Sequence, residues 1–229
     1  MIDHAKGMQE KLCVIVGASA VVEEDFFFYM DMWKAEDRPL LLIAADAGYR
    51  FVREQRIEPD LIVGDFDSLG SVPEHRRIVR HPVQKDETDL LLAVKEAEKE
   101  GCTEFAVFGG LGGRPDHSFA NIQLLTFLQE RGQNGILFGE TMHMTVLLNG
   151  TLLFPQQFEG LLSVFALSGQ AGGVTLQGFK YELKDDVIDR AFPLGVSNEF
   201  TGRQGVISVQ EGELLVMWQR ENQLLPQRP

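Results

Sequence analysis

The stretch from residue 40 to residue 68 reads LLLIAADAGYRFVREQRIEPDLIVGDFDS. It contains two short apolar runs, 40–45 and 60–64, separated by a helix-like segment at 49–57. Neither run alternates apolar with polar residues, which is typical of strands that are covered on both faces in a parallel sheet. A strand, a helix and a second strand in this order predict a βαβ unit, so the stretch indicates the α/β class.

Further runs of the same kind lie on both sides of this unit, at 12–17 (LCVIVG) and 105–109 (FAVFG). Two helices are expected, with Asp86 capping one that runs to Glu100 and Asp116 capping another that ends before Gly132. Their inward faces are expected to carry Leu90, Leu91, Val94 and Ala97, and Phe119, Ile122, Leu125 and Leu128. The first half is therefore predicted to be a doubly wound α/β domain around a parallel sheet.

The pattern changes near Thr141, where alternating segments broken by glycine and polar turns begin. The segment 206–218 (VISVQEGELLVMW) is typical of a hairpin that turns at Glu211-Gly212. We expect an N-terminal α/β domain at residues 1–145, followed by a C-terminal all-β sandwich domain at residues 146–229.

The composition narrows the classes of function. The chain has 229 residues with 21 Lys and Arg against 34 Asp and Glu, a net charge of −13. Because nucleic acids and acidic membrane surfaces are negatively charged, we do not expect this acidic protein to bind either of them. Residues 1–10 lack the apolar core of a signal peptide, and no apolar run reaches the roughly 18 residues of a spanning helix. A cytoplasmic location is the resulting expectation.

Two aspartates directly follow the run at 60–64. In an extended chain, Asp65 and Asp67 point to the same side, so their carboxylates are expected to meet where the strand ends. Two close carboxylates repel each other, and a divalent cation such as Mg²⁺ relieves that repulsion. The alternative is a simple turn in which Asp67 or Ser68 bonds to its own backbone.

A second acidic group occurs in the segment 85–89 (KDETD). The more conventional interpretation is a capping box with Asp86 as N-cap and Asp89 at the third helical position. In the other interpretation Asp89 shares a metal ion with Asp65 and Asp67, and Lys85 meets a phosphate.

The segment 109–117 (GGLGGRPDH) places four glycines between a strand and a helix. Glycines let the backbone approach a ligand closely and turn N–H groups toward it, and a helix N-terminus favours anions. Arg114 offers a planar fork to phosphate oxygens, and His117 and Asn121 lie one turn apart on the same helix face. A flexible linker or a tight turn is the alternative.

A fourth candidate is Asp46-Ala47-Gly48, which ends the run at 40–45, although a strand-ending turn explains it equally well. Since no protein nucleophile is evident, the residues indicate a magnesium-dependent enzyme that transfers a phosphoryl-type group from a nucleotide directly onto a bound acceptor.

The motifs, taken in order, resemble those of the bacterial thiamine pyrophosphokinase family. The resemblance rests on five elements that follow one another through most of the chain, namely Asp46–Gly48, Gly64–Ser68 (GDFDS), Lys85–Asp89, Gly109–His117 (GGLGGRPDH) and Ser197–Phe200 (SNEF).

The resemblance implies a catalytic α/β domain that binds ATP and Mg²⁺, joined to a β-sandwich domain that binds thiamine. It also implies a homodimer with its active sites between subunits, and transfer of the pyrophosphoryl group of ATP to the hydroxyl of thiamine, giving thiamine diphosphate and AMP. Asp65, Asp67 and Asp89 look like metal ligands and, with Asp116, catalytic residues. The ATP site would include Asp46, Lys85, Gly110, Gly112, Gly113, Arg114, His117 and Asn121, and the thiamine site Ser197 and Asn198, with Phe200 or Trp218 as an aromatic wall.

Two other functions are compatible with these residues. One is a non-catalytic nucleotide-binding sensor, and the other is a related phosphotransferase with a different acceptor. A sensor has no need for Asp65, Asp67 and Asp89 together with Arg114, so their joint presence favours an enzyme.

Overall fold

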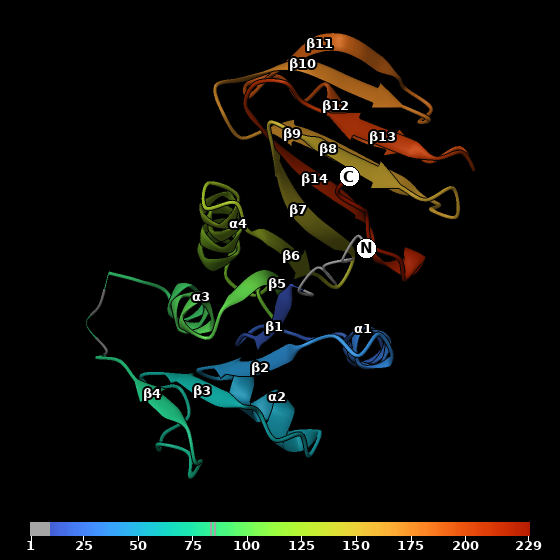
Figure 1. Cartoon of the computed structure of the whole chain (residues 1–229). Coiled ribbons are helices and arrows are strands. Elements are labelled where there is room, and N and C mark those ends of the chain that lie inside the picture. The colour runs from blue at the N-terminus through green and yellow to red at the C-terminus, as the bar shows by residue number, and fades with distance from the viewer. Residues whose placement is uncertain (1–9, 83, 85) are drawn as a thin grey trace, which may run out of the picture.

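The structure is a computed structural model that describes residues 10–82, 84 and 86–229. A single ten-stranded sheet runs through the molecule (Figure 1), and six of its strands form a parallel half in the order β6-β5-β1-β2-β3-β4. These strands are β1 (Lys11–Val16), β2 (Leu40–Ala45), β3 (Leu61–Gly64), β4 (Ile78–Arg80), β5 (Cys102–Phe108) and β6 (Asn134–Phe138). The predicted parallel sheet is confirmed.

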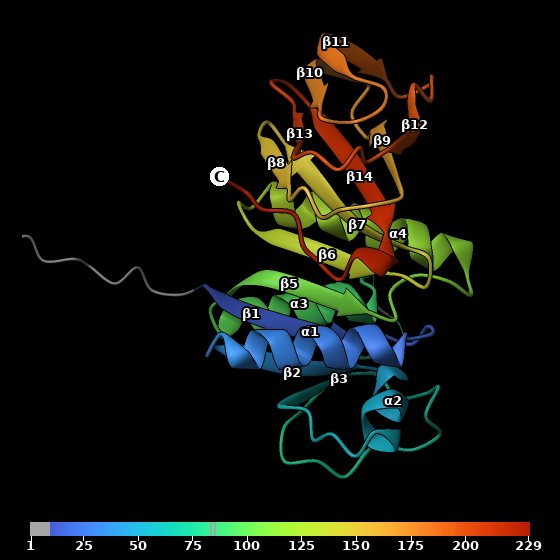
Figure 2. The same ribbon diagram turned by 90° about the vertical axis from the view of Figure 1, so that its right-hand side faces the viewer.

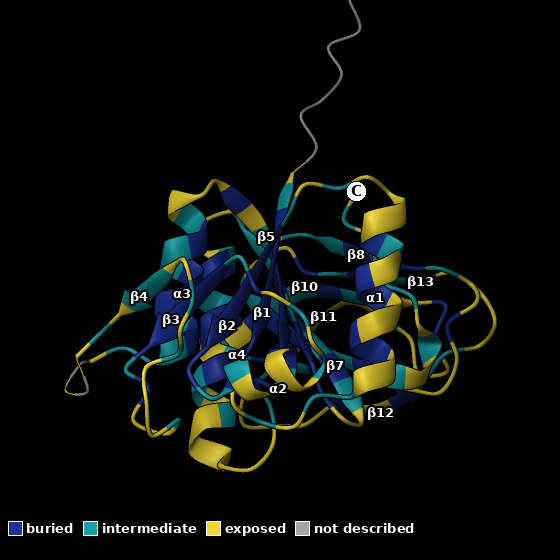
Figure 3. Cartoon of the chain, turned by 90° about the horizontal axis from the view of Figure 1, so that it is seen from below, coloured by how far each residue is buried: buried dark blue, intermediate teal, exposed yellow. Residues whose placement is uncertain are grey.

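Helices cover both faces of this half, as expected for a doubly wound fold. Alternate residues of β1 belong to two different cores, Cys13 and Ile15 to one and Leu12, Val14 and Val16 to the other. Figure 2 shows α1 on one face of the sheet and α3 on the other, and Figure 3 shows the buried strands between exposed helix surfaces. The helices are α1 (Glu23–Ala35), α2 (Gly48–Glu54), α3 (Asp89–Lys99), α4 (Pro115–Gln129) and a short 3-10 turn, η1 (Arg220–Asn222).

Two predicted helix starts are wrong. Helix α3 begins at Asp89, and its N-cap is Thr88, whose hydroxyl accepts a hydrogen bond from the Leu91 amide at 3.2 Å, rather than Asp86. Helix α4 begins at Pro115, because proline is well suited to the first helical position, where no amide donor is needed. Asp116 therefore lies inside the first turn and is not the cap.

One predicted core residue of α4 is also misplaced. The side chain of Phe119 is 61% exposed, whereas Leu125 and Leu128 are buried as expected. None of the described helices combines the length and the apolar character needed to cross a membrane.

The second half extends the same sheet with antiparallel strands. β7 (Met142–Leu148) pairs with β6 and is followed in the sheet by β14 (Glu213–Gln219), β9 (Leu161–Ala166) and β12 (Gly195–Glu199). A four-stranded sheet packs against this part in the order β11-β10-β13-β8. Its strands are β8 (Thr151–Phe154), β10 (Gln170–Gln177), β11 (Leu183–Asp189) and β13 (Gly205–Ser208). Buried Trp218, Phe154, Phe158 and Phe179 fill the space between the sheets, so the predicted all-β sandwich is confirmed.

The predicted hairpin at 206–218 does not form. A turn does separate β13 from β14, but β13 pairs with β8 and β10 in the small sheet, while β14 pairs with β7 and β9 in the large one. The chain thus crosses between layers at this turn. The predicted domain boundary between residues 145 and 146 falls inside β7, and it stays a prediction.

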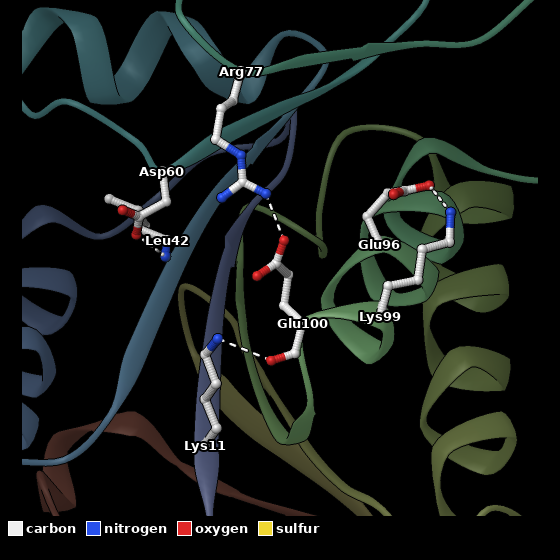
Figure 4. A network of polar contacts seen from close by, with 7 residues as sticks. All are labelled: Lys11, Leu42, Asp60, Arg77, Glu96, Lys99 and Glu100. Carbon is white, nitrogen blue, oxygen red and sulfur yellow. Dashed lines mark hydrogen bonds and ion pairs between the residues drawn. The ribbon is translucent and has the colours of Figure 1, made fainter.

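The amino ends of the parallel strands are closed by polar contacts (Figure 4). Arg77 forms an ion pair of 2.5 Å with Glu100 at the end of α3, and the Lys11 ammonium donates to the Glu100 carbonyl at 2.9 Å. Arg77 holds the pKa of Glu100 below its usual range. The opposite edge, at the carboxyl ends of the strands, is where open α/β sheets bind ligands.

Candidate active site

Asp46 stands at the carboxyl end of β2 in an unusual backbone conformation. Its φ of +45° lies in the left-handed region, and its amide donates to the Val63 carbonyl of β3 at 2.7 Å. The Oδ2 atom accepts a hydrogen bond from the Ser68 hydroxyl. The Oδ1 atom is buried and has no hydrogen-bond partner in the part of the chain that the structure describes. A buried carboxylate oxygen without a partner is costly, which points to a ligand at this position.

Asp65 and Asp67 lie in a turn, and the extended chain predicted between them is wrong. Phe66 has a φ of +66° and a side chain that is only 2% exposed. This conformation is rare for a bulky residue, and burial of the ring holds it in place. The Asp67 amide donates to Asp65 Oδ1 at 3.2 Å, and one carboxylate oxygen of each residue lies within 4.8 Å of the other, so the two carboxyl groups still meet. The pKa of Asp67 is raised, first by its hydrogen bond with the Asp65 carboxyl and then by charge repulsion.

These loops bring three carboxylates together. One oxygen atom from each of Asp46, Asp65 and Asp67 lies within 4.8 Å of the others. Oxygen ligands at this spacing suit a hard divalent cation, and the orphaned Asp46 Oδ1 supports that fit. We call these residues the carboxylate trio.

The third metal ligand expected from the sequence was Asp89, and it is not a member of this trio. The side chain lies at the start of α3 and lines the cavity beside the trio. The metal-binding role of Asp89 therefore stays a prediction.

A cavity of about 480 Å³ opens next to the trio at the carboxyl ends of β1, β2 and β5. The strand order reverses between β1 and β5, and such a switch point is the usual ligand site of a doubly wound sheet. The volume falls within the range of small-molecule sites. The lining residues are Gly17, Ala18, Ser19, Ala45, Asp46, Asp86, Glu87, Thr88, Asp89, Leu90, Gly109, His117 and Asn121.

The loop 17–19 was missed in the sequence. A signal was present, because Gly17-Ala18-Ser19 directly follows the buried run of β1, as Asp46 follows that of β2. This loop offers only backbone groups and one hydroxyl, whereas the predicted metal ligands and catalytic residues are all aspartates.

Hydrogen bonds hold the glycine loop, which comprises residues 109–113, at Gly109, Gly110 and Gly112. The Gly109 carbonyl accepts from the Ser19 amide at 2.9 Å, and the Gly110 carbonyl accepts from the Asn121 side chain at 2.6 Å. The Gly112 amide donates to the Ser118 hydroxyl at 3.1 Å. Asn121 thus supports the loop as well as lining the cavity. The ATP-binding roles of Gly110, Gly112, Gly113, His117 and Asn121 stay predictions.

Arg114 and Asp116 form a bidentate ion pair at the N-terminus of α4. The guanidinium donates to the two carboxylate oxygens at 3.2 and 2.5 Å, and both side chains are exposed. The hydrogen bond with Arg114 lowers the pKa of Asp116. Neither side chain lines the cavity, whereas His117 does. Lys85 lies outside the described residues.

Ser197 and Asn198 lie far from the trio. Asn198 is 2% exposed, and its amide group is occupied by backbone atoms of Tyr181 and Glu199. Seven strand spacings separate β12 from β2, and at about 4.8 Å each they amount to roughly 34 Å across the sheet. One chain therefore does not bring Ser197 and Asn198 to the carboxylates.

The aromatic wall expected at Phe200 or Trp218 also needs correction. Trp218 is fully buried in the sandwich core, and Phe200 packs partly buried against Phe154, Phe158 and Phe179. The indole ring of Trp218 is thus not available to a ligand.

A second cavity of about 470 Å³ lies at the amino ends of β1, β5 and β6. Its charged lining consists of Glu10, Arg38, Glu104 and Arg228, so the charges are balanced. It contains neither the trio nor the glycine loop. We assign the functional site to the carboxyl ends of the strands.

Comparison with known proteins finds similarity along most of the chain. Residues 31–137 match the family model "Thiamin pyrophosphokinase, catalytic domain", and residues 151–214 match "Thiamin pyrophosphokinase, vitamin B1 binding domain". Thiamine pyrophosphokinase of Bacillus subtilis is 29% identical over 202 residues, which cover 82% of this chain and 91% of that protein.

Solved structures show the same similarity. The crystal structure of the Bacillus subtilis thiamine pyrophosphokinase has a TM-score of 0.78 at 27% identity, covering 91% of this chain and 99% of that chain. A thiamin pyrophosphokinase from Geobacillus thermodenitrificans gives 0.75 at 27% identity, with 91% and 97% covered. Yeast thiamin pyrophosphokinase gives 0.72 at 15% identity, with 96% and 89% covered, which shows a shared fold.

Proposed function

The chain belongs to the thiamin pyrophosphokinase family, and from this premise we propose that it transfers the pyrophosphoryl group of ATP to the hydroxyl of thiamine. The products would be thiamine diphosphate and AMP. The observation that carries the proposal is the carboxylate trio, which adjoins a nucleotide-sized cavity at the switch point of the sheet.

Asp46, Asp65 and Asp67 would hold a divalent cation, which we propose to be Mg²⁺. When bound, the cation would neutralise negative charge on the phosphate groups of ATP. The trio itself keeps three oxygen ligands within 4.8 Å of one another before any ligand enters. This preorganisation lowers the cost of assembling the site.

Other residues of the chain would orient the nucleotide and accept a proton. The loop at 17–19 and Gly109 line the cavity, and Arg114 would leave Asp116 to meet phosphate oxygens. Asp89 lines the cavity without belonging to the trio. A carboxylate that is not bound to metal is the better base, so we propose that Asp89 accepts the thiamine hydroxyl proton, in place of the metal-binding role expected from the sequence.

We further propose that the active unit is a homodimer, in which the exposed Ser197 of one copy faces the cavity of the other and the buried Asn198 holds the backbone beside it. The separation of roughly 34 Å within one chain supports this arrangement. Exposed apolar side chains form a patch beside β12: Tyr181, which is 60% exposed, lines a hollow with Leu194 and Val196, and Phe192, which is 64% exposed, lies two residues before Leu194. Exposed apolar residues gathered in this way mark interaction surfaces, and a second copy would cover them.

Phe192→Asp is expected to raise the dimer dissociation constant at least about a hundredfold, because a charge would be buried without a partner. Sedimentation velocity across a dilution series measures the shift. Phe27→Asp on α1, also at an exposed phenylalanine but outside the patch, is the control and should leave the dimer intact. A wild-type monomer, or an unchanged Phe192→Asp dimer, would refute the shared site.

The reaction is tested by incubating the purified protein with ATP, Mg²⁺ and thiamine and identifying the products by mass spectrometry. Thiamine diphosphate and AMP in equal amounts are expected. Thiamine monophosphate with ADP would indicate a simple kinase. Bound ATP without turnover would indicate a sensor.

A further inference from the structure

Ser68 connects the two loops that build the trio. Its hydroxyl donates to Asp46 Oδ2, although Asp46 follows β2 and Ser68 follows β3. The other oxygen of Asp46, Oδ1, is the buried atom without a partner in the described chain. The hydrogen bond from Ser68 restrains the Asp46 carboxylate, one oxygen of which lies within 4.8 Å of oxygens of Asp65 and Asp67.

Arg50 holds Ser68 in turn. It lies one helical turn beyond Asp46 on α2, and its guanidinium donates to the Ser68 carbonyl. The Arg50 amide donates to the Ala47 carbonyl at 3.0 Å, so the residue is anchored in the same turn that carries Asp46. Asp46, Ser68 and Arg50 thus close a ring of contacts between the loop after β2 and the loop after β3.

We infer that Ser68 and Arg50 are positioning residues that orient the Asp46 carboxylate for the divalent cation. The inference rests on the metal site of the proposed function. Neither residue belongs to the trio, and neither lines the cavity. Residues of this kind tune metal affinity by fixing the geometry of a ligand.

Loss of a positioning residue should have a different effect from loss of a residue that only stabilises the fold. Without the Ser68 hydroxyl, Asp46 can rotate, and the three oxygens no longer converge. Metal affinity should fall, while the affinity for thiamine, which does not contact these residues in the proposed arrangement, should remain.

Titration of the wild-type protein and its variants with Mn²⁺ alone, followed by electron paramagnetic resonance, tests the inference without turnover. Ser68→Ala is expected to raise the Mn²⁺ dissociation constant about tenfold, as is usual for loss of a ligand-orienting hydrogen bond. Ser68→Thr keeps the hydroxyl and should bind Mn²⁺ nearly as the wild type does. Ser71→Ala alters an exposed serine of the same loop and is the matched control.

Arg50→Ala should weaken Mn²⁺ binding in the same direction, whereas Arg53→Ala, an exposed arginine one turn on in α2, should not. In turnover, the metal concentration for half-maximal rate should rise about tenfold for Ser68→Ala while the KM for thiamine stays constant.

The possible results distinguish failure of the proposed metal site from failure of the positioning roles of Ser68 and Arg50. Wild-type protein that binds no Mn²⁺ would overturn the proposed metal site and this inference with it. Wild-type protein that binds Mn²⁺, with Ser68→Ala binding it equally well, would overturn the inference alone.

Discussion

Asp67→Asn is expected to lower kcat by at least about a hundredfold at saturating ATP and thiamine, as expected when a group that acts on transition-state charge is lost. The side chain is exposed, so the substitution removes a charge from the trio without disturbing a core. Asparagine keeps the shape of aspartate but offers the cation a weaker ligand. The melting temperature and circular dichroism should therefore match those of the wild type.

Asp31→Asn provides the control for this prediction. It removes an exposed aspartate from α1, outside the trio and outside the lining of the cavity. Activity should be unchanged. Near-normal turnover by Asp67→Asn, measured as thiamine diphosphate formed per minute, would remove Asp67 from the metal site.

Gly109→Ala is expected to destabilise the fold by about 2–5 kcal/mol and to abolish ATP binding, because it combines a left-handed backbone with a clash. Gly109 has a φ of +65°, and a Cβ atom there would lie 2.6 Å from the Gly17 carbonyl oxygen and 2.8 Å from that of Ser19. The loops after β1 and β5 would be forced apart where they form the wall of the cavity. Urea denaturation and calorimetric titration with ATP measure the two effects.

Gly113→Ala separates the two causes. Gly113 has nearly the same φ, +64°, but nothing lies within 4 Å of the position of its Cβ. It should cost only about 1 kcal/mol, the conformational part alone. If both variants lose equal stability, the close approach of β1 and β5 is not what requires glycine at position 109.

Four of the six parallel strands, β1, β2, β3 and β5, could be predicted from sequence because their burial on both faces leaves uninterrupted apolar runs, whereas β4 and β6 are less buried and were not predicted. The run at 40–45 coincides with β2. The run at 60–64 contains all of β3 and the residue before it. The first residue of α3 could not be predicted, because Asp86 and Thr88 are both suitable N-cap residues. The structure shows that Thr88 is the N-cap. The hairpin at 206–218 was wrong because strand pairing is non-local, and a turn sequence does not reveal that its strands enter different sheets.

For the site, the sequence located the loops but not the directions of their side chains. Asp65 and Asp67 meet because Phe66 adopts a left-handed conformation, which no periodicity signals. Asp46 rather than Asp89 completes the trio, since the order of β2 and β3 in the sheet brings their following loops together. The distance from β12 to β2 likewise depends on the strand order, which the sequence does not contain.

Anomalous diffraction from crystals containing Mn²⁺ and a non-hydrolysable ATP analogue would locate the cation directly. We predict a manganese peak bound by oxygens of Asp46, Asp65 and Asp67, with Asp46 Oδ1 among the ligands and the phosphates of the analogue extending into the adjoining cavity. A peak elsewhere, or nucleotide bound with no metal at the trio, would show that the trio is not the metal site of this protein.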